Sequence, residues 1–133
     1  MMRSHDTLRE LLMQLLAAMQ ANATDETASL WNKLDHELRS HMDAEERLVL
    51  PAFGHVDRNE ARALLRQHGR LRELLFELGV AVDLHCLRYE RSHELVNLLL
   101  LHAGREEKLM YCWADQHVAP NIIRELRDRV AGR

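Results

Sequence analysis

Two short segments of the sequence place a histidine four residues before a glutamate. His41 precedes Glu45 in HMDAEERL, and His102 precedes Glu106 in HAGREEKL. Four residues are about one turn of an α-helix, so both side chains of each pair would lie on one helix face. Imidazole nitrogen and carboxylate oxygen are ligands of iron, manganese and zinc. About one of the nine histidines would have such a glutamate by chance. One pair is therefore weak evidence, whereas two pairs in matching contexts predict metal ligation.

Both pairs belong to a longer repeat. HDTLRELL at residues 5–12 and HGRLRELL at residues 68–75 agree at six of eight positions. HMDAEERL and HAGREEKL share the histidine, both glutamates and the leucine. The first two segments are offset by 63 residues and the second two by 61. The sequence therefore predicts an internal duplication of a helical hairpin.

Helical periodicity runs through both copies of the repeat. Strand signals are nearly absent, and apolar residues recur at alternating steps of three and four over residues 5–19, 31–52, 65–82 and 95–113. Each row holds one histidine where an apolar residue is expected. The rows predict an all-α, up-down-up-down antiparallel four-helix bundle, with Pro51 ending the second helix. The residues expected to be buried include Leu65 and Leu109 in the rows, Met13, Met19, Trp31, Met110 and Trp113 as core filler, and Cys86 and Cys112, at least in part.

The turns place the four row histidines at one height in such a bundle. Midpoints between consecutive row histidines fall at residue 23, just before His55, and at His85, where turns are predicted. Unpaired imidazoles and carboxylates would destabilise a leucine core by several kcal/mol, and metal ions would compensate. One carboxylate from each of two helices can bridge two metals, which leaves two histidines for each metal. The predicted metal ligands are His5, His41, Glu45, His68, His102 and Glu106.

These motifs give the chain a family resemblance. HDTLR, HMDAEERLVLP, QHGRLRELL and HAGREEKLMY resemble the hemerythrin-like (HHE cation-binding) domain family over about residues 4–113. The resemblance implies a four-helix bundle holding a non-haem di-iron centre with an oxo or hydroxo bridge. One iron is then expected on His5 and His41, and the other on His68 and His102. Glu45 and Glu106 would be the bridging carboxylates.

The sequence departs from the oxygen-carrying members of that family. Those proteins have a second histidine one turn after the third-helix ligand, where this chain has Arg72. They also use an aspartate at the fifth position after the fourth-helix histidine, where this chain uses Glu106 at the fourth. Each iron would then have five ligands and an open position. These departures favour a site that reacts with, senses or stores something over simple oxygen carriage.

Composition narrows the remaining expectations. The formal net charge of −3 gives no electrostatic reason to expect nucleic acid or a membrane as partner. Two cysteines and the absence of a signal-like N-terminus favour the cytoplasm. All 133 residues are expected to form one domain, with the bundle at about residues 4–117. An extension over about residues 118–133 is expected to hold a short helix, capped by Asn121, with Ile122, Leu126 and Val130 on one face.

Two classes of function remain open at this point. The first is a di-iron protein that binds or reacts with oxygen, nitric oxide or peroxide as a sensor, scavenger or repair protein. The alternative is a metal-storage or metal-stabilised interaction module, in which manganese or zinc replaces iron. Enzymatic activity is undecided, as is the choice between a homodimer and a separate partner protein. Glu46 and Glu107 are either solvated or paired with Arg47 or Lys108, or else they are hydrogen-bonded to ligand histidines or become ligands in some metal states. Arg72 is either at the surface or in the vacated ligand position.

Overall fold

The structure is a computed structural model that describes residues 2–117, and all regular elements in that range are helical. The predicted extension and its short helix lie outside the described residues. The chain forms a helical bundle, as the periodicity predicted. Four long helices make up most of it: α1 (Met2–Gln20), α2 (Thr24–Leu48), α4 (Arg58–Asp83) and α5 (Tyr89–Arg105). The shorter elements are α3 (Leu50–Val56), the π-helical turn η1 (Glu106–Met110) and α6 (Tyr111–His117).

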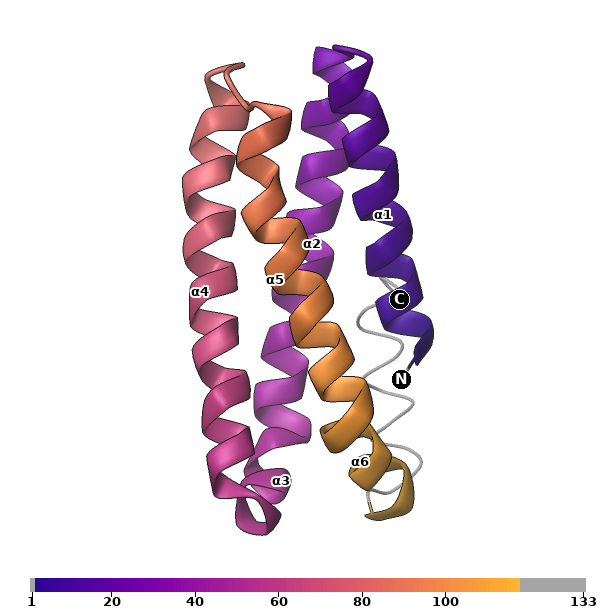
Figure 1. Ribbon diagram of the computed structural model, residues 1–133, viewed down its shortest axis with the longest axis vertical. Coiled ribbons are helices and arrows are strands. Elements are labelled where there is room, and N and C mark those ends of the chain that lie inside the picture. Colours follow the sequence, from indigo (N-terminus) through magenta and orange to yellow (C-terminus); the bar gives the residue numbers. More distant parts are fainter. Residues whose placement is uncertain (1, 118–133) are drawn as a thin grey trace.

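The four long helices lie side by side with their connections at the ends of the bundle (Figure 1). α1 packs on α2 and α5, and α4 packs on the same two helices. The turn after α1 places Asn22 at a φ of 56°, and the loop after α4 places His85 at a φ of 55°. Asparagine and histidine tolerate this left-handed conformation better than most residues. No helix in the described part of the chain combines the length and apolarity that a membrane crossing requires.

Pro51 does not end the second helical segment as predicted. α2 ends earlier, at Leu48, and Pro51 lies in the first turn of α3. Proline lacks the N–H that would bond to the carbonyl of Arg47, so it interrupts a continuing helix but is tolerated at a helix start. The chain passes into α4 at Asp57, whose side chain accepts a hydrogen bond of 3.1 Å from the Glu60 N–H. The proline therefore divides the segment into two helices.

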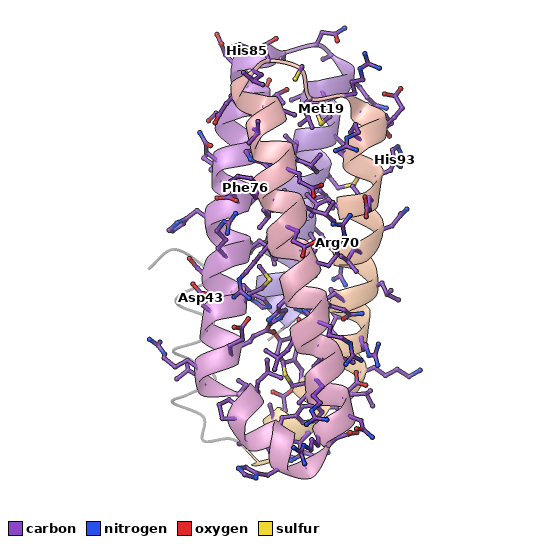
Figure 2. All side chains as sticks on the ribbon, turned by 90° about the vertical axis from the view of Figure 1, so that its left-hand side faces the viewer. Met19, Asp43, Arg70, Phe76, His85 and His93 are labelled. Atoms are coloured by element: carbon purple, nitrogen blue, oxygen red, sulfur yellow. The ribbon has the colours of Figure 1, made fainter. Side chains whose placement is uncertain are left out.

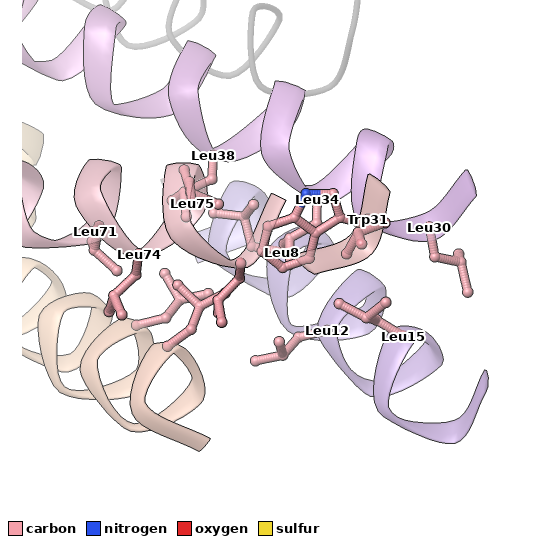
Figure 3. Close-up of a cluster of buried hydrophobic side chains, with 14 of the residues drawn as sticks. Leu8, Leu12, Leu15, Leu30, Trp31, Leu34, Leu38, Leu71, Leu74 and Leu75 are labelled. Atoms are coloured by element: carbon pink, nitrogen blue, oxygen red, sulfur yellow. The ribbon is translucent and has the colours of Figure 1, made fainter. Parts of the chain in front are cut away.

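Leucine side chains fill the interior along most of the bundle. Figure 3 shows them pointing from several helices into one space, and Figure 2 shows charged side chains such as Asp43 and Arg70 on the outside. Burying one such leucine contributes about 1.5–3 kcal/mol to folding. We call this region the leucine core; it comprises Leu8, Leu12, Leu15, Ala18, Met19, Leu30, Trp31, Leu34, Leu38, Met42, Leu71, Leu74, Leu75, Leu78, Val82, Leu95 and Leu99.

A smaller apolar cluster lies at the opposite end of the helices. It gathers residues of α3 with their neighbours on α2, α4, η1 and α6. Phe53 and Trp113 contact each other there, with ring centroids 5.5 Å apart. We call this group the α3-end cluster; it comprises Ala44, Val49, Leu50, Phe53, Ala61, Leu64, Met110, Tyr111 and Ala114.

Several burial predictions are wrong. The π-helical turn η1 holds one more residue than an α-helical turn, so it shifts the buried face from Leu109 to Met110 and from Trp113 to Ala114. Leu109 is 43% exposed and Trp113 is half-buried as a result. Met13 is 68% exposed, because it lies about 100° around the helix from Leu12. Leu65, at the edge of its row, is also exposed. Both cysteines are exposed as well: Cys86 lies in a loop, and Cys112 follows Tyr111.

Candidate metal centre

The structure brings the six predicted ligand residues together in the interior, between the leucine core and the α3-end cluster. Each is at most 2% exposed. They form two groups of four, and within each group the potential ligand atoms all lie within 4.8 Å of one another. Both glutamates belong to both groups. We call the group with His5 and His41 the first site, and the group with His68 and His102 the second site.

Each glutamate directs one oxygen to each site. Glu45 Oε2 lies 2.9 Å from His41 Nε2, and Glu45 Oε1 lies 3.2 Å from His68 Nε2. Glu106 Oε1 lies 3.1 Å from His5 Nε2, and Glu106 Oε2 lies 2.9 Å from His102 Nε2. Glu45 comes from α2 and Glu106 from η1, so the two carboxylates enter from different helical segments. This is the arrangement that two carboxylates bridging a pair of cations require.

The donor atoms themselves fit cations. His68 Nε2 and His102 Nε2 lie 3.0 Å apart. Two N–H groups cannot point at each other at that distance, so at least one of these nitrogens directs a lone pair at the other. Glu45 Oε1 and Glu106 Oε2 are buried and have no hydrogen-bond partner among the described residues. They lie close to histidine nitrogens, but not in hydrogen-bonding geometry. A buried carboxylate oxygen without a donor is costly. Cations at the two sites would satisfy these atoms.

Protonation offers a second way to balance the charges. Burial alone lowers the pKa of His41, but the carboxylates of Glu45 and Glu106 outweigh it and raise that pKa to about 10. The same opposing effects raise the pKa of His68 to about 9. Burial favours the neutral form of Glu106, yet the surrounding histidines, His102 foremost, hold its pKa well below 4.5. Without metal, this layer is therefore a buried network of imidazolium and carboxylate, and metal must displace protons from it.

Three of the four histidines are held from behind at Nδ1. Glu107 Oε1 lies 2.7 Å from His5 Nδ1, and Glu46 Oε2 lies 2.6 Å from His68 Nδ1. The amide oxygen of Gln67 lies 2.7 Å from His102 Nδ1. His41 Nδ1 has no hydrogen-bond partner in the described part of the chain. An acceptor at Nδ1 keeps the proton there and turns the Nε2 lone pair towards the site. Among the alternatives for Glu46 and Glu107, the contact with a histidine is therefore the observed one.

An arginine holds each of these outer carboxylates. Arg9 donates to Glu107 over 3.0 Å, and Arg72 lies 2.8 Å from Glu46 and 2.9 Å from Asp43. The Arg72 guanidinium is thus engaged by Glu46 and Asp43, so Arg72 lies at the surface and not in the vacated ligand position. The remaining described histidine side chains lie outside the centre, since His36, His55, His85 and His93 are all exposed.

Tyr111 is a residue of the centre that sequence reasoning missed. It is 2% exposed. Its hydroxyl donates a short hydrogen bond to Glu45 Oε2 and lies 2.9 Å from His41 Nε2. Burial, reinforced by the neighbouring carboxylates, raises its pKa well above 10, so the phenol is neutral in the metal-free protein. Tyr111 was visible as the last letter of HAGREEKLMY, but an uninterrupted α-helical row passes from Leu109 to Trp113 and leaves it out.

Comparison with known proteins agrees with this geometry. No curated protein and no solved structure matches the chain significantly. The sequence does match the family model described as the hemerythrin HHE cation binding domain, over residues 1–114 of 133. That range contains all six candidate ligands and Tyr111. The family's description as cation-binding agrees with two buried groups of histidine and glutamate donors. The chain therefore belongs to the hemerythrin HHE cation-binding domain family.

Proposed function

We propose that this protein is a di-iron protein with an up-down-up-down four-helix architecture. His5 and His41 hold one ion, His68 and His102 hold the other, and Glu45 and Glu106 bridge the two. The observation that carries this proposal is that both buried carboxylates present one oxygen to each site. A single-metal site would need only one side of each carboxylate.

We further propose that the centre binds or reacts with oxygen, nitric oxide or peroxide as a sensor, scavenger or repair protein. Two adjacent iron ions supply the capacity to bind small diatomic molecules and to exchange electrons with them. The protein orients the histidines through Glu46, Glu107 and Gln67, and apolar clusters on both sides exclude bulk water. At the point in the sequence where the oxygen carriers have another histidine, this chain has Arg72, so that ligand is missing; this supports reaction or sensing over carriage.

A second function is favoured by the location of the site. Its ligands come from α1, α2, α4, α5 and η1, so bound metal would tie the helices together. Histidine and glutamate also suit manganese and zinc. A metal-storage or metal-stabilised interaction module is therefore the alternative, and the chemistry of the bound ion separates the two.

Metal analysis and spectroscopy of the purified protein test the proposal. We expect two irons per chain and the near-ultraviolet absorption of a bridged ferric pair, whereas a zinc protein would be colourless. The reduced protein, mixed with oxygen in a stopped-flow instrument, should oxidise without reversible release. Variants of exposed histidines, His36→Ala and His93→Ala, serve as controls and should retain both metals. One metal per chain would contradict the paired site, and an oxygen adduct released under vacuum would return the protein to the carrier class.

A further inference from the structure

The two sites differ in the number of donor atoms that the protein directs at them. Both have two histidine nitrogens and two carboxylate oxygens. The first site also has the Tyr111 hydroxyl, 2.9 Å from His41 Nε2 and hydrogen-bonded to Glu45 Oε2. The second site has no such phenol. The offset of 61 residues that relates the two copies matches Tyr111 to Leu50, which is buried but carries no donor atom.

The Tyr111 ring is fixed in its place. Its centroid lies 5.0 Å from that of His5 and 6.4 Å from that of His41, and the two histidine rings are 5.1 Å apart. The preceding π-helical turn brings Tyr111 onto the buried face, and the α3-end cluster packs around it. The hydroxyl oxygen therefore lies among the donor atoms of the first site, where an added small ligand would need space.

Among residues 2–117, no side chain covers the second site as Tyr111 covers the first. The residue one turn after His68 is Arg72, and its guanidinium is held by Glu46 and Asp43. Glu46 and Gln67 contact the second-site histidines at Nδ1. That side of each ring faces away from the carboxylates of Glu45 and Glu106. In the described structure, four protein donors thus face the second site, and five face the first.

We infer that an external small molecule binds at the second site, between His68 and His102, because Tyr111 closes the first. This inference rests on the proposed di-iron function and specifies which ion is accessible. Tyr111 then acts as a selectivity residue that makes two duplicated sites unequal. Removing its hydroxyl should open the first site, and adding an imidazole at position 72 should close the second.

Nitric oxide uptake by the ferrous protein tests this directly. After iron analysis, each protein is titrated anaerobically with nitric oxide, and the number bound per chain is counted from the optical and electron paramagnetic resonance spectra. We expect one for the unmodified protein and two for Tyr111→Phe, which keeps the ring. We expect none for Arg72→His, and one for the double variant, at the other iron and with a changed spectrum. Matched controls are Tyr89→Phe, far from the centre, and Arg66→His, which adds an imidazole at an exposed position of α4; each should bind one.

The outcomes separate this inference from the proposed function. If the unmodified chain holds fewer than two irons, the di-iron function is wrong and the inference falls with it. If two irons are present but Tyr111→Phe still binds one nitric oxide, Tyr111 does not close the first site. If Arg72→His still binds one, the accessible iron is not at the second site. Either of these last results overturns the inference and leaves the di-iron centre standing.

Discussion

The leucine core and the candidate metal centre occupy the same helices but are stabilised by different interactions. The leucine core contains only apolar buried side chains, which need no partner beyond one another. A few residues along the helices, the centre buries four imidazoles and two carboxylates, and two of its carboxylate oxygens have no hydrogen-bond donor in the described structure. Apolar burial is non-directional and independent of pH, whereas buried ionisable groups depend on protons, cations and exact geometry.

This contrast implies a division of labour. The leucine core should hold the helices in place whether or not metal is present, so the ligands are already gathered when an ion arrives. The centre adds stability only in the correct ionic state. Damage to the leucine core should therefore lower stability without changing the site, and damage to the centre should change metal binding first.

The largest effect is expected from removing a bridging carboxylate. Glu45→Ala or Glu106→Ala takes one oxygen from each site at once, so the paired site should be lost and metal content should fall from two ions to one or none. Metal analysis after gel filtration measures this. Glu73→Ala is the control, because Glu73 is an exposed partner of Arg70 and should leave both ions bound. Two ions at unchanged affinity in either bridging variant would show that the carboxylates do not bridge.

The next largest effect is expected in the leucine core. Leu34 is fully buried, so Leu34→Ala should lower the free energy of unfolding by about 2–5 kcal/mol through lost burial and the cavity left behind. The folded fraction should still bind two metals with unchanged affinity. Leu101→Ala, at a residue that is 63% exposed, should change stability by less than about 0.5 kcal/mol. Chemical unfolding with parallel metal analysis checks both. Loss of metal from folded Leu34→Ala would mean that the two regions are not independent.

The sequence predicted the parts of the centre that depend on regular periodicity. His5, His41, His68 and His102 lie on helical rows, and a regular helix keeps its phase, so the rows and the duplication together placed them at one height. Glu45 and Glu106 follow from the same spacing. The apolar rows likewise predicted most of the leucine core, since it lies where the helices are uninterrupted.

Met13 and Leu65 were mispredicted within regular helices, because each lies at the edge of the buried face. Other errors lie where the helices depart from regularity. A π-helical turn has no distinct residue pattern, so the sequence did not predict η1. Its extra residue brings Tyr111 into the centre and turns Leu109 out of the interior. Pro51 indicates a break but not that a helix resumes after it. The contacts of Glu46 with His68 and of Glu107 with His5 join different helices. Side-chain conformation decides such contacts, so the sequence left both readings open.

A smaller effect is expected from pH, and its sign differs between the metal-bound and metal-free protein. The folded pKa values of His41 and His68, about 10 and about 9, lie above the ordinary value of 6.5. Their protonated forms therefore stabilise the metal-free fold fully below about pH 6.5, and this contribution is lost as pH rises towards 9–10. The low pKa of Glu106 affects stability only below about pH 4.5.

Metal binding has the opposite dependence, because it requires neutral histidines. The difference in melting temperature between metal-loaded and chelated protein should therefore widen from pH 6 to pH 8, by roughly 5 °C. Thermal melts with and without chelator at both pH values measure it. The melting temperature of chelated His41→Phe, which lacks one of the titrating imidazoles, should depend less on pH than that of the chelated unmodified protein. A difference that narrows with rising pH would contradict the proton displacement.

The smallest effect is expected from the outer carboxylates, and it tests how much of the centre depends on orientation. Glu46→Gln and Glu107→Gln keep an oxygen that can accept from His68 or His5 at Nδ1, but they remove the charge and weaken the pairing with arginine. One ligand histidine already has a neutral acceptor, because the amide oxygen of Gln67 contacts His102 at Nδ1. Complete loss of such a partner typically lowers metal affinity about 10- to 100-fold, so these variants, which keep the acceptor, should lower it by less than about 10-fold. Competition with a chelator of known affinity measures it. Glu94→Gln removes a carboxylate from an exposed arginine pair without touching a histidine, and it should have no effect.

Because the two glutamates occupy matched positions, we expect equal losses in the two variants. Unchanged affinity in both would show that helix packing alone orients the imidazoles, and the centre would then be as self-sufficient as the leucine core.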